Sequence, residues 1–153
     1  MGMSIVMMGI ATLTWAGVGF SLAFGDGGSW NAVIGNPFDH ALLENLSGTW
    51  DGLTIPGLSF ALFQGMFAII TPALISGALV ERLSFRFWCL FTPLWLLVVY
   101  APLAHMVWGG GFLGKDLDFA GGTVVHISSG VSALVLAGLV AVSYTHLRAH
   151  ETL

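Results

Sequence analysis

The chain has 153 residues, of which 56% are hydrophobic and only 8% are charged, and its mean hydropathy is +0.89. Soluble domains are about one quarter charged, so this composition excludes a water-soluble fold and indicates a membrane protein. The net charge of −4 and the lack of a basic cluster exclude a nucleic-acid-binding surface. A single cysteine, Cys89, excludes a disulfide framework or a thiolate metal site within one chain.

The first half of the chain contains two apolar segments with the length of a membrane-spanning helix, which needs about 20 residues. Ile5 to Phe24 has no charged side chain and predicts the first span. The second span is predicted from Pro56 to Val80, with Thr54 as its N-cap and a kink at Pro72. Between them, Gly25 to Thr54 carries acidic residues but no lysine or arginine, which predicts an aqueous loop.

Two further spans are predicted in the second half of the chain. The third runs from Phe87 to about Val107, and the fourth from Phe119 to Ala141. Small residues recur at every fourth position of the fourth span, which favours close approach of another helix. These residues are Ser129, Ala133, Ala137 and Ala141.

The sequence therefore predicts an all-α polytopic membrane helix bundle with four transmembrane helices. Its orientation follows from the basic residues, because cytoplasmic loops are enriched in lysine and arginine. Arg82 and Arg86 fall in the short loop Glu81 to Arg86, which is predicted to be cytoplasmic. The loops Gly25 to Thr54 and Gly109 to Asp118 are then external.

The last twelve residues differ abruptly from the rest. Val142 to Thr152 loses the apolar pattern and resembles the translation of a transposon-type sequencing adapter read in frame. We therefore predict a membrane domain at residues 1–141 and a non-native tail at residues 142–153, and the tail is set aside from functional reasoning.

His126 is an ionisable residue inside the fourth predicted span, roughly 9 Å below its start at about 1.5 Å per residue. A charge at that depth is costly, so the ring is expected to be neutral and turned toward protein or a pore. It is either a histidine satisfied by a neighbouring helix or a functional group. A metal site is poorly supported, because no second ligand follows at helical spacing.

Other polar and aromatic residues gather near the predicted outer ends of the spans. Asp118 stands where its carboxylate caps the fourth helix, and it also projects negative potential that attracts a cation. Trp108, at the end of the third span, fits an interfacial aromatic belt or a cation-binding ring face. Phe63 and Phe67 lie one turn apart on the second span.

Three motifs occur in order: FQGMFAIITPALISGALVERLSF, VYAPLAHMVWGGG and DFAGGTVVHISSG. Together they resemble the ammonium transporter (Amt/Mep/Rh) family over nearly the whole of residues 1–141. Rh-type members tend to lack a tryptophan at the position of Trp108, so the resemblance favours the Amt branch.

The resemblance implies roles for the residues singled out above. Trp108 would offer its ring face to an ammonium ion in an outer vestibule. Phe63 and Phe67 match the FQ-x-x-F segment, in which Phe67 closes the pore below the recruitment site. Asp118 would shape the vestibule, and His126 matches the first of two pore histidines that share a hydrogen bond.

The resulting hypothesis is transmembrane transport of ammonium or ammonia, with methylammonium as a further candidate substrate. An uncharged base crosses an apolar conduit far more easily than a cation, so deprotonation is expected before passage. The resemblance also implies a homotrimer in the lipid bilayer of the cell membrane, without a cofactor. The chain lacks the family's first helix and stops after the fifth, so it is expected not to enclose a pore alone.

Three other function classes compete with transport. The main alternative is an ammonium sensor, in which the same half is coupled to a signalling domain beyond the end of this chain. An intramembrane enzyme would need a nucleophile and base or a metal cluster, which a lone His126 does not supply. A purely structural membrane subunit would not explain why Asp118, His126 and Trp108 gather near the outer ends of adjacent spans.

Overall fold

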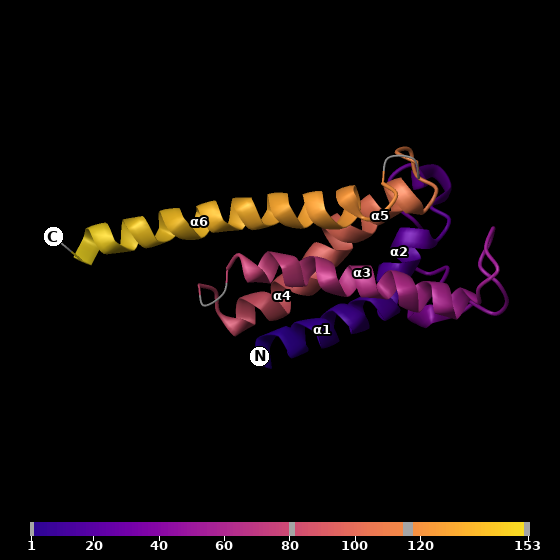
Figure 1. The fold of residues 1–153 in the computed structure, drawn as a ribbon, viewed down its shortest axis with the longest axis horizontal. Coiled ribbons are helices and arrows are strands. Elements are labelled where there is room, and N and C mark those ends of the chain that lie inside the picture. Colours follow the sequence, from indigo (N-terminus) through magenta and orange to yellow (C-terminus); the bar gives the residue numbers. More distant parts are fainter. Residues whose placement is uncertain (1, 80–81, 115–117, 152–153) are drawn as a thin grey trace.

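The chain folds as a bundle of long helices in a computed structural model that describes residues 2–79, 82–114 and 118–151 (Figure 1). Four helical segments in this part of the chain are long and apolar enough to cross a membrane. Their bounds are Ile5–Phe24, Gly57–Gly77, Phe85–Trp108 and Gly122–Ala141. The predicted all-α bundle with four spans is therefore confirmed.

The first span is one continuous helix with a widened turn in its middle. It consists of α1 (Gly2–Thr14), a π-helical turn (Trp15–Gly19) and α2 (Phe20–Phe24). The indole Nε1 of Trp15 donates to the carbonyl oxygen of Ala61 at 3.1 Å. This bond fastens the first span to α3 at the level of the π-helical turn.

The second span is α3 (Gly57–Gly77), and Pro56 is its N-cap. The predicted cap at Thr54 is wrong. Residues 49–56 form a tight turn in which Trp50 N–H donates to the Ile55 carbonyl at 3.0 Å, and this turn leaves Thr54 exposed, ahead of the helix start. Val80 and Glu81, at the end of this predicted span, lie outside the described residues.

The third span comprises α4 (Phe85–Trp95), a π-helical turn (Leu96–Tyr100) and α5 (Ala101–Trp108). It begins two residues before the predicted start at Phe87, because the hydroxyl of Ser84 caps the helix by accepting the N–H of Phe87 at 3.3 Å. Pro102 stands in the first turn of α5. Proline is tolerated in a first turn, because its missing N–H has no helical partner there.

The fourth span begins with a π-helical turn (Gly122–Ile127) and continues as α6 (Ser128–Glu151). The predicted start at Phe119 is wrong, because residues 118–121 form the capping turn that precedes the helix. The helix continues past Ala141, and the division of the chain at that residue stays a prediction.

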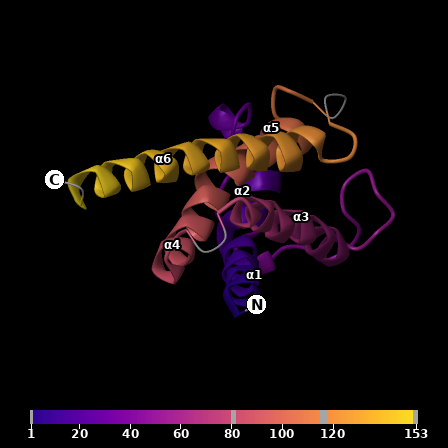
Figure 2. The same ribbon diagram turned by 60° about the vertical axis from the view of Figure 1, so that its left-hand side comes forward.

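The small residues of α6 largely face the bundle. Ser129 is buried, and Ala133 and Ala137 pack against the core, whereas Ala141 is exposed. The helix lies along α3, and its C-terminal part extends beyond α3 and α4 (Figures 1 and 2). Trp95 Nε1 donates to the Ser132 hydroxyl at 3.0 Å and ties α4 to α6.

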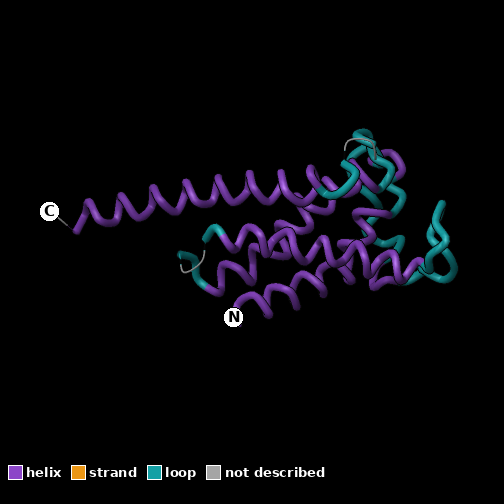
Figure 3. Tube along the Cα trace, viewed as in Figure 1, coloured by secondary structure: helices purple, strands orange, loops and turns teal. Residues whose placement is uncertain are grey.

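The connections between spans lie at opposite ends of the bundle. The long segment before α3 and the segment between α5 and the fourth span gather at one end, whereas the short connection between α3 and α4 lies at the other (Figure 3). We call the first of these the loop-rich end. Trp108 and Asp118 lie at this end and share a cavity with Phe60, Phe63 and Phe67 of α3.

Candidate functional site

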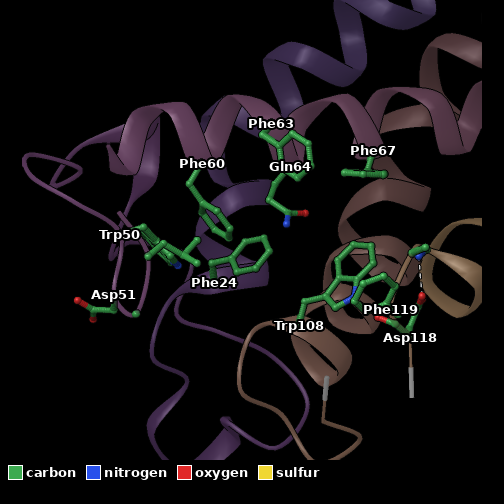
Figure 4. A pocket seen from close by; sticks show the side chains of 14 residues that line it. Phe24, Trp50, Asp51, Phe60, Phe63, Gln64, Phe67, Trp108, Asp118 and Phe119 are labelled. Atoms are coloured by element: carbon green, nitrogen blue, oxygen red, sulfur yellow. Dashed lines mark hydrogen bonds between the residues drawn. The ribbon is translucent and has the colours of Figure 1, made fainter. Parts of the chain in front are cut away.

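A cavity of about 380 Å³ opens at the loop-rich end, between α3 and the segment that follows α5. Four of the five residues singled out from the sequence line it: Phe63, Phe67, Trp108 and Asp118. Side chains from the first span and the long loop complete its wall (Figure 4). These additional residues include Phe24, Trp50, Phe60 and Gln64.

Half of the residues that line the cavity are aromatic. The Phe67 ring lies 5.9 Å from the Trp108 ring between centroids, and it meets Phe63 edge-on at 5.2 Å. On the loop side, Trp50 stacks on Phe60 at 4.7 Å with 14° between the ring planes. Clustered π faces attract a cation through their negative quadrupoles, so the wall is suited to a small positive ligand.

Asp118 is the most heavily hydrogen-bonded side chain at the cavity. Its Oδ1 accepts the N–H groups of Gly121 (2.6 Å) and Gly122 (2.8 Å). Its Oδ2 accepts those of Thr123 (2.8 Å) and Val124 (2.8 Å). The predicted capping role of Asp118 is confirmed, and one carboxylate satisfies four donors at the start of the helix.

Gly121 makes this convergence possible. Its φ of +86° is in the left-handed region, which glycine adopts at little cost. The chain reverses there, and the next N–H groups turn toward the carboxylate that precedes them. A side chain at this position would be strained by the backbone conformation itself.

The environment of Asp118 keeps it ionised. Burial raises the pKa of the carboxyl, but the four backbone N–H groups outweigh burial and hold the pKa below its ordinary value. Both oxygens are occupied by these donors, and the residue is only 6% exposed. Asp118 therefore contributes its negative field and the loop that it fixes to the cavity.

Asp118 also holds the indole of Trp108. The backbone carbonyl of Asp118 accepts the Nε1 proton of Trp108 at 3.1 Å. With its only polar group engaged, the indole presents an apolar ring to the cavity. This hydrogen bond therefore fixes Trp108 relative to Asp118 at the rim of the cavity.

His126 is not among the residues that line the cavity. It lies in the first turn of the fourth span, closer to the helix start than the sequence predicts, and its side chain is exposed. Its Nδ1 lies 3.0 Å from the carbonyl oxygen of Gly121. A carbonyl only accepts, so Nδ1 is the donor, and in a neutral ring Nε2 then carries the free lone pair.

Sequence reasoning missed a second histidine, His105, which is completely buried. Its Nδ1 lies 3.0 Å from the Ala23 carbonyl at the end of α2, and its Nε2 lies 2.8 Å from the Asn31 carbonyl in the long loop. The carbonyl of His105 accepts the N–H groups of Gly109 and Gly111, both at 3.0 Å. His105 therefore joins α2, the long loop and the glycine segment one turn away from Trp108.

The close packing around His105 leaves no space at Gly109. A Cβ at this position would lie 2.0 Å from the Ala23 carbonyl oxygen and 2.8 Å from His105 Nδ1. His105 and Gln64 were both visible as polar residues within apolar spans, which is the signal that could have revealed them. Trp50 and Phe24 reach the cavity only through tertiary folding, so no local sequence pattern predicts that they line it.

Membrane-length helices around an aromatic cavity at one end define a polytopic membrane protein. The family-wide sequence model described as "Ammonium Transporter Family" matches residues 1–151. The chain belongs to this family, which confirms the resemblance of its motifs.

Individual relatives agree with this assignment. The chain is 50% identical over 135 residues to an ammonium transporter of Aquifex aeolicus, covering 87% of this chain and 31% of that protein. It is 45% identical over 142 residues to an ammonium transporter of Bacillus subtilis, covering 88% of this chain and 33% of that protein. The chain thus spans about a third of the length of these curated relatives.

The fold is also similar to crystal structures of fungal Mep2 proteins. Mep2 of Saccharomyces cerevisiae superposes with a TM-score of 0.77 at 34% identity, covering 86% of this chain and 30% of that one. A Candida albicans Mep2 deletion mutant gives a TM-score of 0.76 at 38% identity, covering 85% of this chain and 33% of that one.

Asp118→Asn should destabilise the full-length protein that carries this segment. The amide keeps one acceptor oxygen but points its NH₂ group at backbone N–H donors. Each backbone N–H that loses its acceptor lowers the free energy of unfolding by about 1–3 kcal/mol. Because the folded pKa is depressed, the stabilisation is complete above the ordinary pKa of about 3.9 and is lost as the pH falls through the folded value. Thermal unfolding in detergent should show a constant deficit from pH 5 to 8 that shrinks in stronger acid.

The exposed cavity residue Asp51 supplies the control, because Asp51→Asn should leave the unfolding temperature nearly unchanged. A deficit for Asp118→Asn that grows on acidification would contradict the assigned direction of the pKa shift.

His105→Phe should also lower the unfolding temperature. The phenyl ring fills the space but removes the ring N–H that His105 donates to one of the two nearby carbonyls, those of Ala23 and Asn31. The loss of this hydrogen bond costs about 1–3 kcal/mol. His40→Phe is the matched control, since the His40 ring is partly exposed and its nearest carbonyl contact is a longer one of 3.4 Å. Equal unfolding temperatures for the two variants would show that His105 does not join these segments.

Proposed function

We propose that this chain is the substrate-recruiting part of a transmembrane ammonium transporter. Ammonium is captured in the aromatic cavity at the loop-rich end, and ammonia then passes His126. The observation that carries this proposal is the Trp108 ring held against Phe67 beside the ionised Asp118. The names of the relatives, which are ammonium transporters, support the choice of substrate.

Capture rests on two attractions of different range. The negative field of Asp118 raises the local concentration of cations near the cavity. At short range, an indole face attracts a cation by about 0.5 to 2 kcal/mol, with the larger value where water is excluded. Trp108 is half-buried and anchored through Nε1, so its ring faces are available without reorganisation.

Passage requires loss of the charge. A cation in the apolar interior of a membrane is strongly disfavoured, whereas ammonia is neutral. Phe67, on the wall beside Trp108, is the proposed gate between the wet cavity and the conduit. The lone pair on His126 Nε2 is the proposed proton acceptor, because Nδ1 is engaged with the Gly121 carbonyl.

The remaining features of the proposal concern the whole protein. Arg82 and Arg86 assign the short connection between α3 and α4 to the cytoplasm, which places the loop-rich end outside. Methylammonium is a second substrate, and the working assembly is a homotrimer in the cell membrane. The protein transports without chemical conversion of its substrate and is not an enzyme.

Trp108→Leu should weaken recruitment in the full-length transporter. Loss of about 0.5 to 2 kcal/mol of cation attraction corresponds to an increase of about 2- to 30-fold in the half-saturating ammonium concentration. Methylammonium uptake, competed by ammonium, measures this change. Trp30→Leu is the control, because Trp30 is 73% exposed in the long loop and does not line the cavity. An unchanged half-saturating concentration would remove Trp108 from the recruitment site.

His126→Leu should act on the rate instead of on capture. Removal of a positioned proton acceptor typically slows proton transfer by about 10²-fold or more. The maximal uptake rate should therefore fall, while the half-saturating concentration changes little. A full maximal rate in this variant would exclude His126 from the proton pathway.

A further inference from the structure

His105 is a completely buried imidazole whose two nitrogens both face carbonyl oxygens. Nδ1 lies 3.0 Å from the carbonyl oxygen of Ala23, and Nε2 lies 2.8 Å from that of Asn31. A carbonyl oxygen only accepts hydrogen bonds, whereas a neutral imidazole carries a single N–H. A neutral ring therefore satisfies one of the two carbonyls, and its other nitrogen points a lone pair at the second oxygen.

The backbone N–H groups nearest to these carbonyls along the chain are engaged elsewhere. Those three and four residues after Ala23 donate to Asp39 Oδ2 and to Asn31 Oδ1. Those three and four residues after Asn31 donate to the carbonyls of Trp30 and Leu22. A buried carbonyl that faces a lone pair is left unsatisfied, which is rare in folded proteins. Protonation of the ring removes this conflict, because an imidazolium donates from both nitrogens.

The backbone around the ring is suited to a positive charge. His105 stands in the last turn of α5, and Ala23 is one of the last residues of α2. The C-terminal end of a helix carries a partial negative charge, which stabilises a histidine cation placed there. Burial opposes the charge, but two charge-assisted hydrogen bonds compensate for the lost water.

Other ionisable groups near α5 act on the ring through their fields. Among the described residues, the ring nitrogens make hydrogen-bond contacts only with the two carbonyls. The segments 20–24 and 109–114 carry no ionisable side chain, and Lys115 and Asp116 lie outside the described residues. The ionisable groups of the remaining neighbouring segments are Asp26, Asp39, His40, Glu44 and Asp51 in the long loop, Tyr100 before α5, and Asp118 and His126 at the start of the fourth span.

We propose that His105 is a positioning residue that binds a proton in the folded protein, and that its imidazolium donates to both carbonyls at once. In this state two hydrogen bonds fasten the end of α2 and the long loop to α5. Loss of the proton leaves one of them. The backbone carbonyl of His105 also holds Gly109 and Gly111, so the ring links the long loop to the segment that follows Trp108.

The proposal makes the attachment of the long loop dependent on pH. Acid supplies the proton for the second hydrogen bond, and alkali removes it. A hydrogen bond from a charged donor changes an equilibrium by about 10- to 100-fold. The inference goes beyond the proposed function, because it concerns how the loop-rich end is held together and does not depend on the ligand.

Nuclear magnetic resonance of the full-length protein with ¹⁵N-labelled histidine tests the protonation directly. The signal that disappears in His105→Gln belongs to His105. It should show two protonated ring nitrogens at about pH 5.5 and one at about pH 8.5, within the range in which histidine commonly changes charge. If His105→Gln does not fold, ¹³C-labelled alanine assigns the same signal through the preceding Ala104. A single protonated nitrogen at both pH values would overturn the proposal.

Amide hydrogen exchange of residues 25–40 tests the positioning role. After correction for the intrinsic effect of pH, protection in the wild type should fall about 10- to 100-fold between these pH values. Glutamine offers one donor and one acceptor without a titrating proton, so His105→Gln should show the lower protection at both.

His40→Gln is the matched control, because His40 lies in the same loop and its ring is partly exposed. This variant should keep the pH dependence of the wild type. Protection that depends on pH equally in His105→Gln and in the wild type, or that is independent of pH in the wild type, would overturn the role of His105.

Discussion

The site depends above all on the capture of four backbone N–H groups by the carboxylate of Asp118. This interaction fixes the start of the fourth span, keeps a negative charge at the rim, and places the Asp118 carbonyl where it holds the Trp108 indole. These four hydrogen bonds require the left-handed backbone conformation of Gly121. Because both oxygens accept backbone N–H groups, the carboxylate is proposed to act on a cation through its field and not through a direct bond.

Behind this rim, aromatic side chains make up half of the residues that line the cavity, and their ring faces favour a cation that has lost part of its water. His126 lies outside the cavity, on an exposed face of the fourth span. The residues proposed to bind a cation therefore lie apart from the residue proposed to accept its proton.

The span assignments were predictable from the sequence, because about 20 consecutive apolar residues have few alternatives in a membrane protein. The capping role of Asp118 was also predictable, since it depends on residues adjacent in the chain. Helix boundaries that depend on tertiary folding were not predictable from the sequence. A turn of the long loop places Thr54 ahead of α3, and the fourth span starts after Phe119. His105 and Trp50 act on segments remote in sequence, so only the folded chain reveals their partners.

The proposed function requires that a protonated amine occupies the indole face of Trp108 inside this cavity. Crystals of the full-length protein, prepared with and without saturating methylammonium, test it most directly. Difference density for a two-atom ligand is expected on the indole face of Trp108, beside Phe67. A cavity that is identical in the two crystals, or methylammonium bound only elsewhere, would contradict it.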